Sequence, residues 1–166
     1  KEKRDLRDIK SMLKSRDFRA LVRDLSLRMT QSPDLRRFGG VREVASIVRS
    51  LANLRIKSKT ILAAVEANSD WLVNNGSAQD IADTAWAFAT LRTPAPMIFK
   101  KIEERASFLV EKGNPQEIAN TAWAFATLST PAPILCKMIE ERASFLVEKG
   151  NPQAIANTAW AFAKLN

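Results

Sequence analysis

Apolar residues in the second half of the chain recur with the spacing of an α-helix. Residues 115–128 carry two apolar stripes side by side, Ile118, Ala122, Phe125 and Ala126 in one and Ala119 and Trp123 in the other. A helix with two apolar faces is suited to lie wedged between neighbouring helices. Residues 132–149 carry one stripe, made of Ile139, Ala143, Leu146 and Val147, with Lys137 and Glu141 at i and i+4 on the polar side. The pattern predicts a helix pair, named helix A and helix B below.

The pair recurs every 37 residues. Trp86, Trp123 and Trp160 are each separated by that distance, within the similar segments AQDIADTAWAFATL (78–91), PQEIANTAWAFATL (115–128) and PQAIANTAWAFAKL (152–165). A divergent copy, VREVASIVRSLANL, occupies residues 41–54, one period earlier. Between the 37-residue units that start at Gly76 and Gly113, only nine positions differ. Such self-similarity is typical of stacked helical repeats.

Capping residues predict where the helices begin and end. Asn114 and Glu117 form a capping-box pattern at the start of helix A, with Pro115 at its first position. Helix B then ends at Gly150, which we expect in the left-handed conformation. The predicted helices span 41–54, 58–75, 78–91, 95–112, 115–128, 132–149 and 152–165, with at least one more before residue 30 and no β-sheet. The three tryptophans of helix A should be largely buried.

A unit of this size cannot bury its own apolar face, so copies must stack. We therefore predict an all-α fold, a right-handed α-solenoid of antiparallel helix pairs with a 37-residue repeat. Residues 1–40 are predicted to form a basic N-terminal helical cap, with one short helix marked by Leu6, Ile9 and Leu13 and another by Phe18, Leu21, Val22 and Leu25. The repeat array takes residues 41–166, divided into 41–77, 78–114, 115–151 and a half repeat, 152–166.

Composition argues against an enzyme. The chain has no histidine, which removes the commonest general base and metal ligand. Its single cysteine, Cys136, takes the place of Phe99 in the previous copy, so it is expected to be a packing residue. The acidic pairs Glu103–Glu104 and Glu140–Glu141 recur with the repeat and are expected on a solvated helix face. No cofactor, metal site or transmembrane segment is expected.

Net positive charge is confined to the N-terminal third. Residues 1–60 hold 17 Lys and Arg against 7 Asp and Glu, whereas residues 61–166 hold 9 against 11. Such a run is compatible with a solvated helix face or with a polyanionic partner. The best candidates for an RNA-binding basic patch are Arg36, Arg37, Arg42, Arg49, Arg55, Lys57 and Lys59.

The segment Gln-x-x-Ala-Asn-x-x-Trp-Ala at 116–124 and 153–161, followed by Pro-Ala-Pro, resembles the octotricopeptide repeat family, and heptatricopeptide arrays are similar. The resemblance covers residues 41–166. It implies an organellar α-solenoid that binds RNA and supports transcript stability, processing or translation, with about one nucleotide per repeat contacted from helix A. Organellar localisation follows, with the chloroplast slightly preferred over the mitochondrion.

Residues of helix A outside its apolar stripes are the candidate readers. They are Glu43, Ser46, Ser50 and Asn53; Asp80, Asp83, Ala87 and Thr90; Glu117, Asn120, Ala124 and Thr127; and Ala154, Asn157, Ala161 and Lys164. An Asn carboxamide can pair with a base edge, although Asn120 and Asn157 could equally tie adjacent repeats together. Asp80, Asp83 and Glu117 would repel a phosphate backbone.

A second function remains open, a structural or assembly subunit held by protein contacts in a large organellar complex such as a ribosome or photosystem. The last helix A has no helix B after it, which leaves Ile155, Ala159 and Phe162 as a C-terminal docking face for another chain or for a continuation of this one. Because the sequence starts at Lys1, we expect it to be processed or cut from a longer chain.

Overall fold

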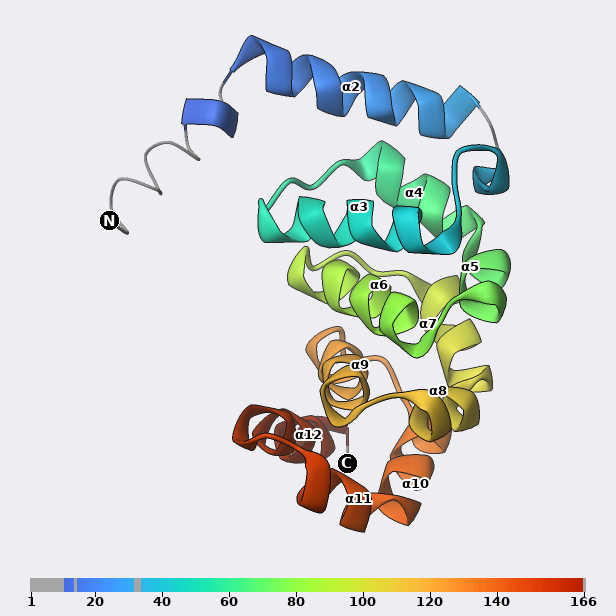
Figure 1. Ribbon diagram of the computed structural model, residues 1–166, viewed down its shortest axis with the longest axis vertical. Coiled ribbons are helices and arrows are strands. Elements are labelled where there is room, and N and C mark those ends of the chain that lie inside the picture. The colour runs from blue at the N-terminus through green and yellow to red at the C-terminus, as the bar shows by residue number, and fades with distance from the viewer. Residues whose placement is uncertain (1–10, 14, 32–33, 166) are drawn as a thin grey trace.

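The computed structural model describes residues 11–13, 15–31 and 34–165, and within these ranges it contains helices and no strand (Figure 1). The elements are α2 (Arg16–Gln31), the 3₁₀ helix η1 (Leu35–Arg37), α3 (Val41–Asn53), α4 (Lys59–Ala67), α5 (Ser69–Asn75), α6 (Ala78–Thr90), α7 (Pro96–Glu104), α8 (Ala106–Lys112), α9 (Pro115–Thr127), α10 (Pro133–Glu141), α11 (Ala143–Lys149) and α12 (Pro152–Leu165). The predicted all-helical class is confirmed.

The helices lie in two rows that run along the molecule (Figure 1). The A helices α3, α6, α9 and α12 pack on one another in sequence order. In the second row α5 packs on α7 and α8 packs on α10, while α2 covers α4 at the N-terminal end. Each A helix therefore has an A helix as its neighbour along the row, as its second apolar stripe predicts.

The A helices begin where the capping residues predict. In α9 the Asn114 side chain accepts a hydrogen bond from the Glu117 backbone N–H (3.0 Å), and the Glu117 carboxylate accepts one from the Asn114 N–H (2.9 Å). Ser77 and Asp80 form the same capping box at α6. The predicted boundaries of the A helices agree with the structure to within about one residue.

Helix B is not one helix, contrary to the sequence-based prediction. Each predicted helix-B segment divides into a helix of nine residues and one of seven, at Asn68, Arg105 or Arg142. The backbone at these three residues turns away from helical geometry, with φ between −104° and −112°. The break aims the Arg105 and Arg142 side chains at backbone carbonyls of the preceding unit, as described below.

Gly150 does not adopt the predicted left-handed conformation, since its φ is −75°. Glycine is needed there because a Cβ would lie 2.3 Å from the carbonyl oxygen of Leu146. The left-handed residues are instead Arg55, Arg92 and Ser129, one after each of the first three A helices. After each of these residues, the backbone N–H of the next residue donates a hydrogen bond to the carbonyl oxygen five residues before it, for example from Thr93 to Phe88, and this bond closes the helix.

Phenylalanines, and not tryptophans, fill the centre between the rows. Phe88, Phe99 and Phe125 are fully buried, and the Phe99 and Phe125 rings meet edge to face at 4.7 Å. The prediction of largely buried tryptophans is wrong: Trp86 and Trp123 are half-buried, and Trp160 is 41% exposed. Trp86 and Trp123 pack against the core as partly buried side chains.

At the N-terminal end, α2 supplies the second of the two predicted cap helices. Leu6 and Ile9, which mark the first, lie outside the described residues. No helix in the described part of the chain is long and apolar enough to span a membrane.

Candidate functional site

Two of the predicted reader residues, Asp80 and Glu117, cap the N-terminal ends of A helices. The carboxylates of Asp80 and Glu117 accept hydrogen bonds from the backbone N–H groups of Ser77 and Asn114 in the capping boxes. Asp80 also accepts a hydrogen bond from the Ser77 hydroxyl (2.7 Å). Both acids are thus engaged by backbone donors and contribute to helix capping.

Asp83 is bound across the seam between two A helices. Its carboxylate pairs with the Arg49 guanidinium of α3, and that guanidinium also stacks on the Trp86 ring, 4.7 Å from the ring centre. Burial raises the pKa of Asp83 above its ordinary value, and the adjacent Arg49 opposes this shift. Arg49 therefore stabilises the α3–α6 contact besides carrying charge.

The other predicted readers differ in exposure. Asn120 accepts a hydrogen bond from Gln116 within α9 (2.9 Å), and the amide of Asn151 donates to Gln116 (3.2 Å). Asn157 is half-buried, and Lys164 is exposed at the end of α12. The hydroxyl oxygens of Thr90 and Thr127 are buried without a hydrogen-bond partner.

Four alanines predicted as readers are buried, which corrects the prediction. They are Ala87, Ala124, Ala154 and Ala161. Consecutive A helices pack so closely that an alanine side chain fills the space between them. On α3, at the N-terminal end of the row, Glu43, Ser46, Ser50 and Asn53 are exposed.

A column of large side chains runs along the helix-A row, and sequence analysis did not propose it as a site. It consists of Arg49, Trp86, Trp123 and Trp160, which occupy the same position in four successive A helices. The column is partly exposed: Arg49, Trp86 and Trp123 are half-buried, and Trp160 is exposed. The 37-residue spacing of the tryptophans could have revealed this column. Sequence analysis placed them in the core instead, because large aromatic residues are usually buried.

Beside this column, polar groups of successive A helices surround a shallow hollow. It is lined by Arg49, Gln79, Asp83, Asn114, Gln116, Glu117 and Asn120. Three of the predicted readers, Asp83, Glu117 and Asn120, therefore do come together. Amides and paired charges offer both hydrogen-bond donors and acceptors there.

The predicted basic patch is divided between the two ends of α3. Arg36 and Arg37 lie on η1, just before α3 begins, while Arg55 and Lys57 follow its last residue. A helix of 13 residues separates the two groups by about 20 Å. Arg42 belongs to the first group and Lys59 to the second. Lys57 donates a hydrogen bond to the Arg92 carbonyl oxygen in the next unit (3.0 Å).

Helix α2 adds a basic surface that the list of candidates omitted. Arg16, Arg19 and Arg23 lie on one face of α2, around a hollow that they share with Ala20. The Ser26 hydroxyl of α2 lies 3.3 Å from that of Ser58, just before α4. Helix α2 therefore holds its arginines over the same end of the molecule as α4.

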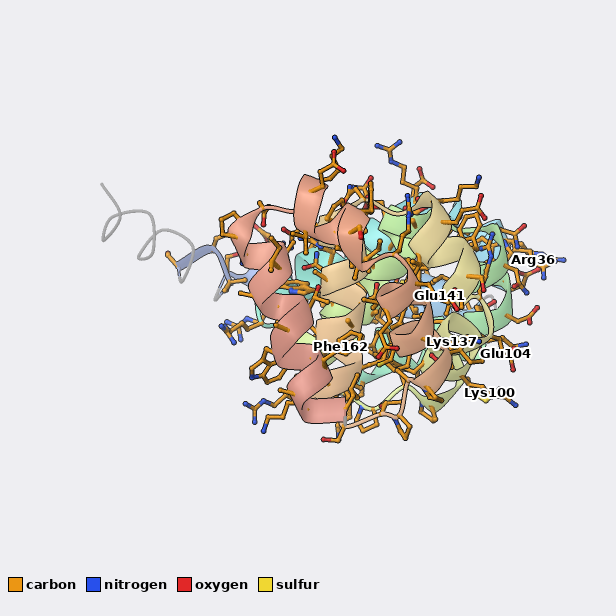
Figure 2. All side chains as sticks on the ribbon, turned by 90° about the horizontal axis from the view of Figure 1, so that it is seen from below. Arg36, Lys100, Glu104, Lys137, Glu141 and Phe162 are labelled. Carbon is orange, nitrogen blue, oxygen red and sulfur yellow. The ribbon has the colours of Figure 1, made fainter. Side chains whose placement is uncertain are left out.

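At the opposite end an apolar groove opens between α10, α11 and α12. Ile155, Ala159 and Phe162, the predicted docking face, all line it. Figure 2 looks onto this end, with Phe162 on α12 and Lys137 and Glu141 to its right in the view. Lys137 and Glu141 form the predicted ion pair (3.9 Å).

Cys136 and Glu103 carry side chains of the kinds that support catalysis, but each lies in an environment that fits a structural role. Burial raises the pKa of the Cys136 thiol, with smaller contributions from Glu103 and Glu140, so that the thiol stays protonated at neutral pH. Glu103 accepts hydrogen bonds from the first backbone N–H groups of α10. Among the described residues, His, Cys, Asp and Glu form no group of three or more that could hold a metal ion.

Fold and surface together define an all-helical protein in which the A helices α3, α6 and α9 are each followed by two shorter helices. Residues 12–166 match the family described as RNA-editing substrate-binding complex 6 protein, and the chain belongs to this family. The match covers nearly the whole chain, but it is not to the octotricopeptide or heptatricopeptide families that the motif resembles. No curated protein and no solved structure is similar enough to the chain to match it.

Proposed function

We propose that this protein is a non-catalytic helical-repeat scaffold that binds single-stranded RNA within an RNA-editing complex of an organelle. The family description names an RNA-editing substrate-binding complex, which supports a role beside RNA and among other subunits. In this proposal residues 1–40 act as a basic cap and residues 41–166 as a right-handed solenoid of 37-residue repeats, of the same architectural type as octotricopeptide arrays. The family match gives no support to the chloroplast favoured by the motif resemblance, and for a component of an RNA-editing complex we propose the mitochondrion instead.

The column of Arg49, Trp86, Trp123 and Trp160 carries the proposal. Single-stranded nucleic acids bind to proteins by stacking bases on exposed aromatic rings and on guanidinium planes. In the column the Arg49 guanidinium already covers one face of the Trp86 ring, and the partly exposed rings of Trp123 and Trp160 follow at the same position of the next two A helices. Stacking is tolerant of base identity, so nearly identical repeats need not restrict the RNA to a monotonous sequence.

Electrostatic attraction would come from the N-terminal end. The helix-A surface itself is nearly neutral, because Asp83 neutralises Arg49 and the acids of the capping boxes lie nearby. The arginines of α2 and the two basic groups at the ends of α3 supply the positive charge that phosphates require. We propose that RNA enters over α2 and α3 and follows the column toward α12.

The test is to replace Trp160 by Leu, which keeps apolar bulk but removes the aromatic face. Binding of a fluorescently labelled single-stranded RNA should weaken roughly 5- to 150-fold, the range for one lost base stack. Trp71→Leu is the matched control, since Trp71 is half-buried on α5, outside the column. Equal affinities of the two variants would exclude the column as the RNA site.

A protein-docking role is the second candidate function, and the apolar groove at α12 favours it. The two roles are compatible, because the groove and the basic surface lie at opposite ends of the molecule (Figure 1).

A further inference from the structure

The links that follow α3, α6 and α9 form one edge of the helix-A row. They are residues 54–58, 91–95 and 128–132, and Figure 1 shows that α3 and α6 end on the same side of the molecule. The Lys57 ammonium reaches from the first link to the second, where it donates a hydrogen bond to the Arg92 carbonyl oxygen (3.0 Å). The first two links therefore lie side by side. The three links together are named the loop edge below.

Each link contains a residue in the left-handed conformation. These residues are Arg55, Arg92 and Ser129, 37 residues apart, with φ of 55°, 46° and 52°. Glycine takes this conformation without strain, whereas any other residue brings its Cβ close to the following carbonyl oxygen. All three side chains are exposed, so packing does not offset the strain. An exposed arginine at a strained position in two successive links indicates a function for the charge.

Helix closure alone does not explain these arginines. Positive side chains are favoured at the C-terminal end of a helix, because its last carbonyl groups carry partial negative charge. Helix α9, however, ends at Ser129 with the same backbone hydrogen bond, from the Thr130 N–H to the Phe125 carbonyl oxygen (2.9 Å). The closure therefore forms equally well without a charged residue.

The loop edge differs in charge from the opposite ends of α6 and α9. Its exposed cations are Arg55, Lys57, Lys59 and Arg92. The three links contain no acidic residue. At the opposite ends of α6 and α9, capping hydrogen bonds hold the carboxylates of Asp80 and Glu117. A phosphate backbone is attracted to the first of these edges and repelled by the second.

A hollow between the first two links is suited to a sugar–phosphate group. It encloses about 250 Å³, and Lys57 and Lys59 line it together with apolar residues such as Leu62 and Pro94. Glu66 also lines it, but its carboxylate accepts hydrogen bonds from the first free N–H groups of α7. The carbon face of a ribose can pack on the apolar residues while its phosphate meets the two ammonium groups.

The tryptophan column lies about one helical turn from the loop edge. Trp86 and Trp123 each precede the last residue of their helix by four residues, which is about 6 Å along a helix axis. On the other side of the column lies the polar hollow, where Gln116 and Asn120 offer amide groups. A base stacked on a ring can therefore turn its edge toward the amides while its phosphate reaches the loop edge.

We propose that the loop edge binds the phosphate backbone of the RNA, with the bases over the column and their edges toward the polar hollow. Arg55 and Arg92 contact successive phosphates, and Lys57 and Lys59 hold the phosphate between them. The third link, with Ser129 in place of an arginine, binds the backbone most weakly. This site belongs to the proposed RNA-binding function and rests on it for the presence of RNA.

Arg92→Gly tests the site without endangering the fold, because glycine is unstrained at a left-handed position. Binding of a fluorescently labelled, mixed-sequence single-stranded RNA to the whole chain should weaken about fivefold at about 0.1 M salt, and the slope of log affinity against log salt should become shallower by about 0.7. The midpoint of urea unfolding should stay unchanged or rise. Lys112→Ala is the matched control, since it removes one exposed charge at the end of α8, on the side where α9 begins. Its effect on affinity should be much smaller, because salt screens distant charges.

Ser129→Arg is the complementary variant, which adds a cation to the link that lacks one. RNA binding should strengthen about fivefold at about 0.1 M salt, and the salt slope should steepen by about 0.7. Ser144→Arg is its control, because it adds the same charge at an exposed position on α11, outside the loop edge.

Equal effects of Arg92→Gly and Lys112→Ala, or of Ser129→Arg and Ser144→Arg, would overturn the proposal. If Arg92→Gly lowers the unfolding midpoint, the comparison of the two serine variants decides alone. Weaker RNA binding in Trp160→Leu, together with equal effects within these pairs, would keep the column as the RNA site and exclude the loop edge. If the RNA does not bind and polyglutamate does, with an affinity that Arg92→Gly lowers, the edge serves an acidic protein and the RNA function fails as well.

Discussion

Helices α9 and α12 have almost the same sequence but different surroundings. PQEIANTAWAFAT in α9 and PQAIANTAWAFAK in α12 differ at two positions. In α9, Ile118 and Phe125 are completely buried, whereas the equivalent Ile155 is 38% exposed and Phe162 is half-buried. Helix α10 covers α9, and no described element covers α12 in the same way. The comparison teaches that the burial of a helix A depends on the helix B that follows it, as expected for a stack held by nearest-neighbour contacts.

A buried charge should produce the largest difference between the two positions. Val110→Asp places a carboxylate where the side chain is 3% exposed, and we expect it to unfold the protein or to cost more than about 4 kcal/mol. Val147→Asp, at a position 68% exposed, should change the stability by less than about 0.5 kcal/mol. Urea unfolding followed by circular dichroism measures both. Similar losses would show that α11 is covered in solution.

Truncation of the equivalent phenylalanines should show the next largest difference. Phe125→Ala removes a buried ring that contacts Phe99 and should cost about 3–5 kcal/mol. Phe162→Ala should cost less than half as much, because its ring already borders the open groove. Equal changes in the unfolding midpoint would contradict the difference in packing.

The capping carboxylates provide a smaller comparison. Glu103→Ala deprives the start of α10 of its hydrogen-bond acceptor and should cost about 1 kcal/mol. Glu140→Ala, one repeat later, should leave stability unchanged, because the exposed Glu140 carboxylate caps no helix among the described residues. The same unfolding experiment distinguishes them, and a cost at Glu140 equal to that at Glu103 would mean that the carboxylate already caps a helix.

The smallest expected effect on stability is at Asp83 of α6, which corresponds to Asn120 of α9. Burial raises the pKa of Asp83 in the folded state, so its ionised form is disfavoured by folding. Its contribution to stability therefore increases as the pH falls through that pKa and decreases as the pH rises through it. Asp83→Asn should be at least as stable as the wild type at pH 7 and lose that advantage toward pH 4. A variant that is less stable at pH 7 would show that the ion pair with Arg49 outweighs burial.

Local pattern was sufficient to predict the helix-A boundaries and the capping boxes. These depend on residues close in sequence, such as Asn114 with Glu117. The break in helix B was not predictable in this way, because Arg105 and Arg142 are ordinary helix residues until the preceding unit offers carbonyls to them. The split of the basic residues between the ends of α3 likewise depends on how the chain folds around that helix.

The candidate site was predicted less completely than the fold. Three of the residues predicted as readers on helix A, Asp83, Glu117 and Asn120, lie around one hollow. The same prediction included alanines that close packing buries. It missed the tryptophan column, because a large aromatic residue at a helix contact is more often interior than surface. The three residues predicted as a docking face, Ile155, Ala159 and Phe162, do line one apolar groove, and their docking role stays a prediction.

Hydrogen exchange measured by mass spectrometry compares α9 and α12 most directly. In the isolated chain, amides of residues 152–165 should exchange well before those of residues 115–127, because α12 lacks the cover that α10 gives to α9. Equal protection of the two helices without any partner would contradict the account, since it would mean that the stack closes its own C-terminal end.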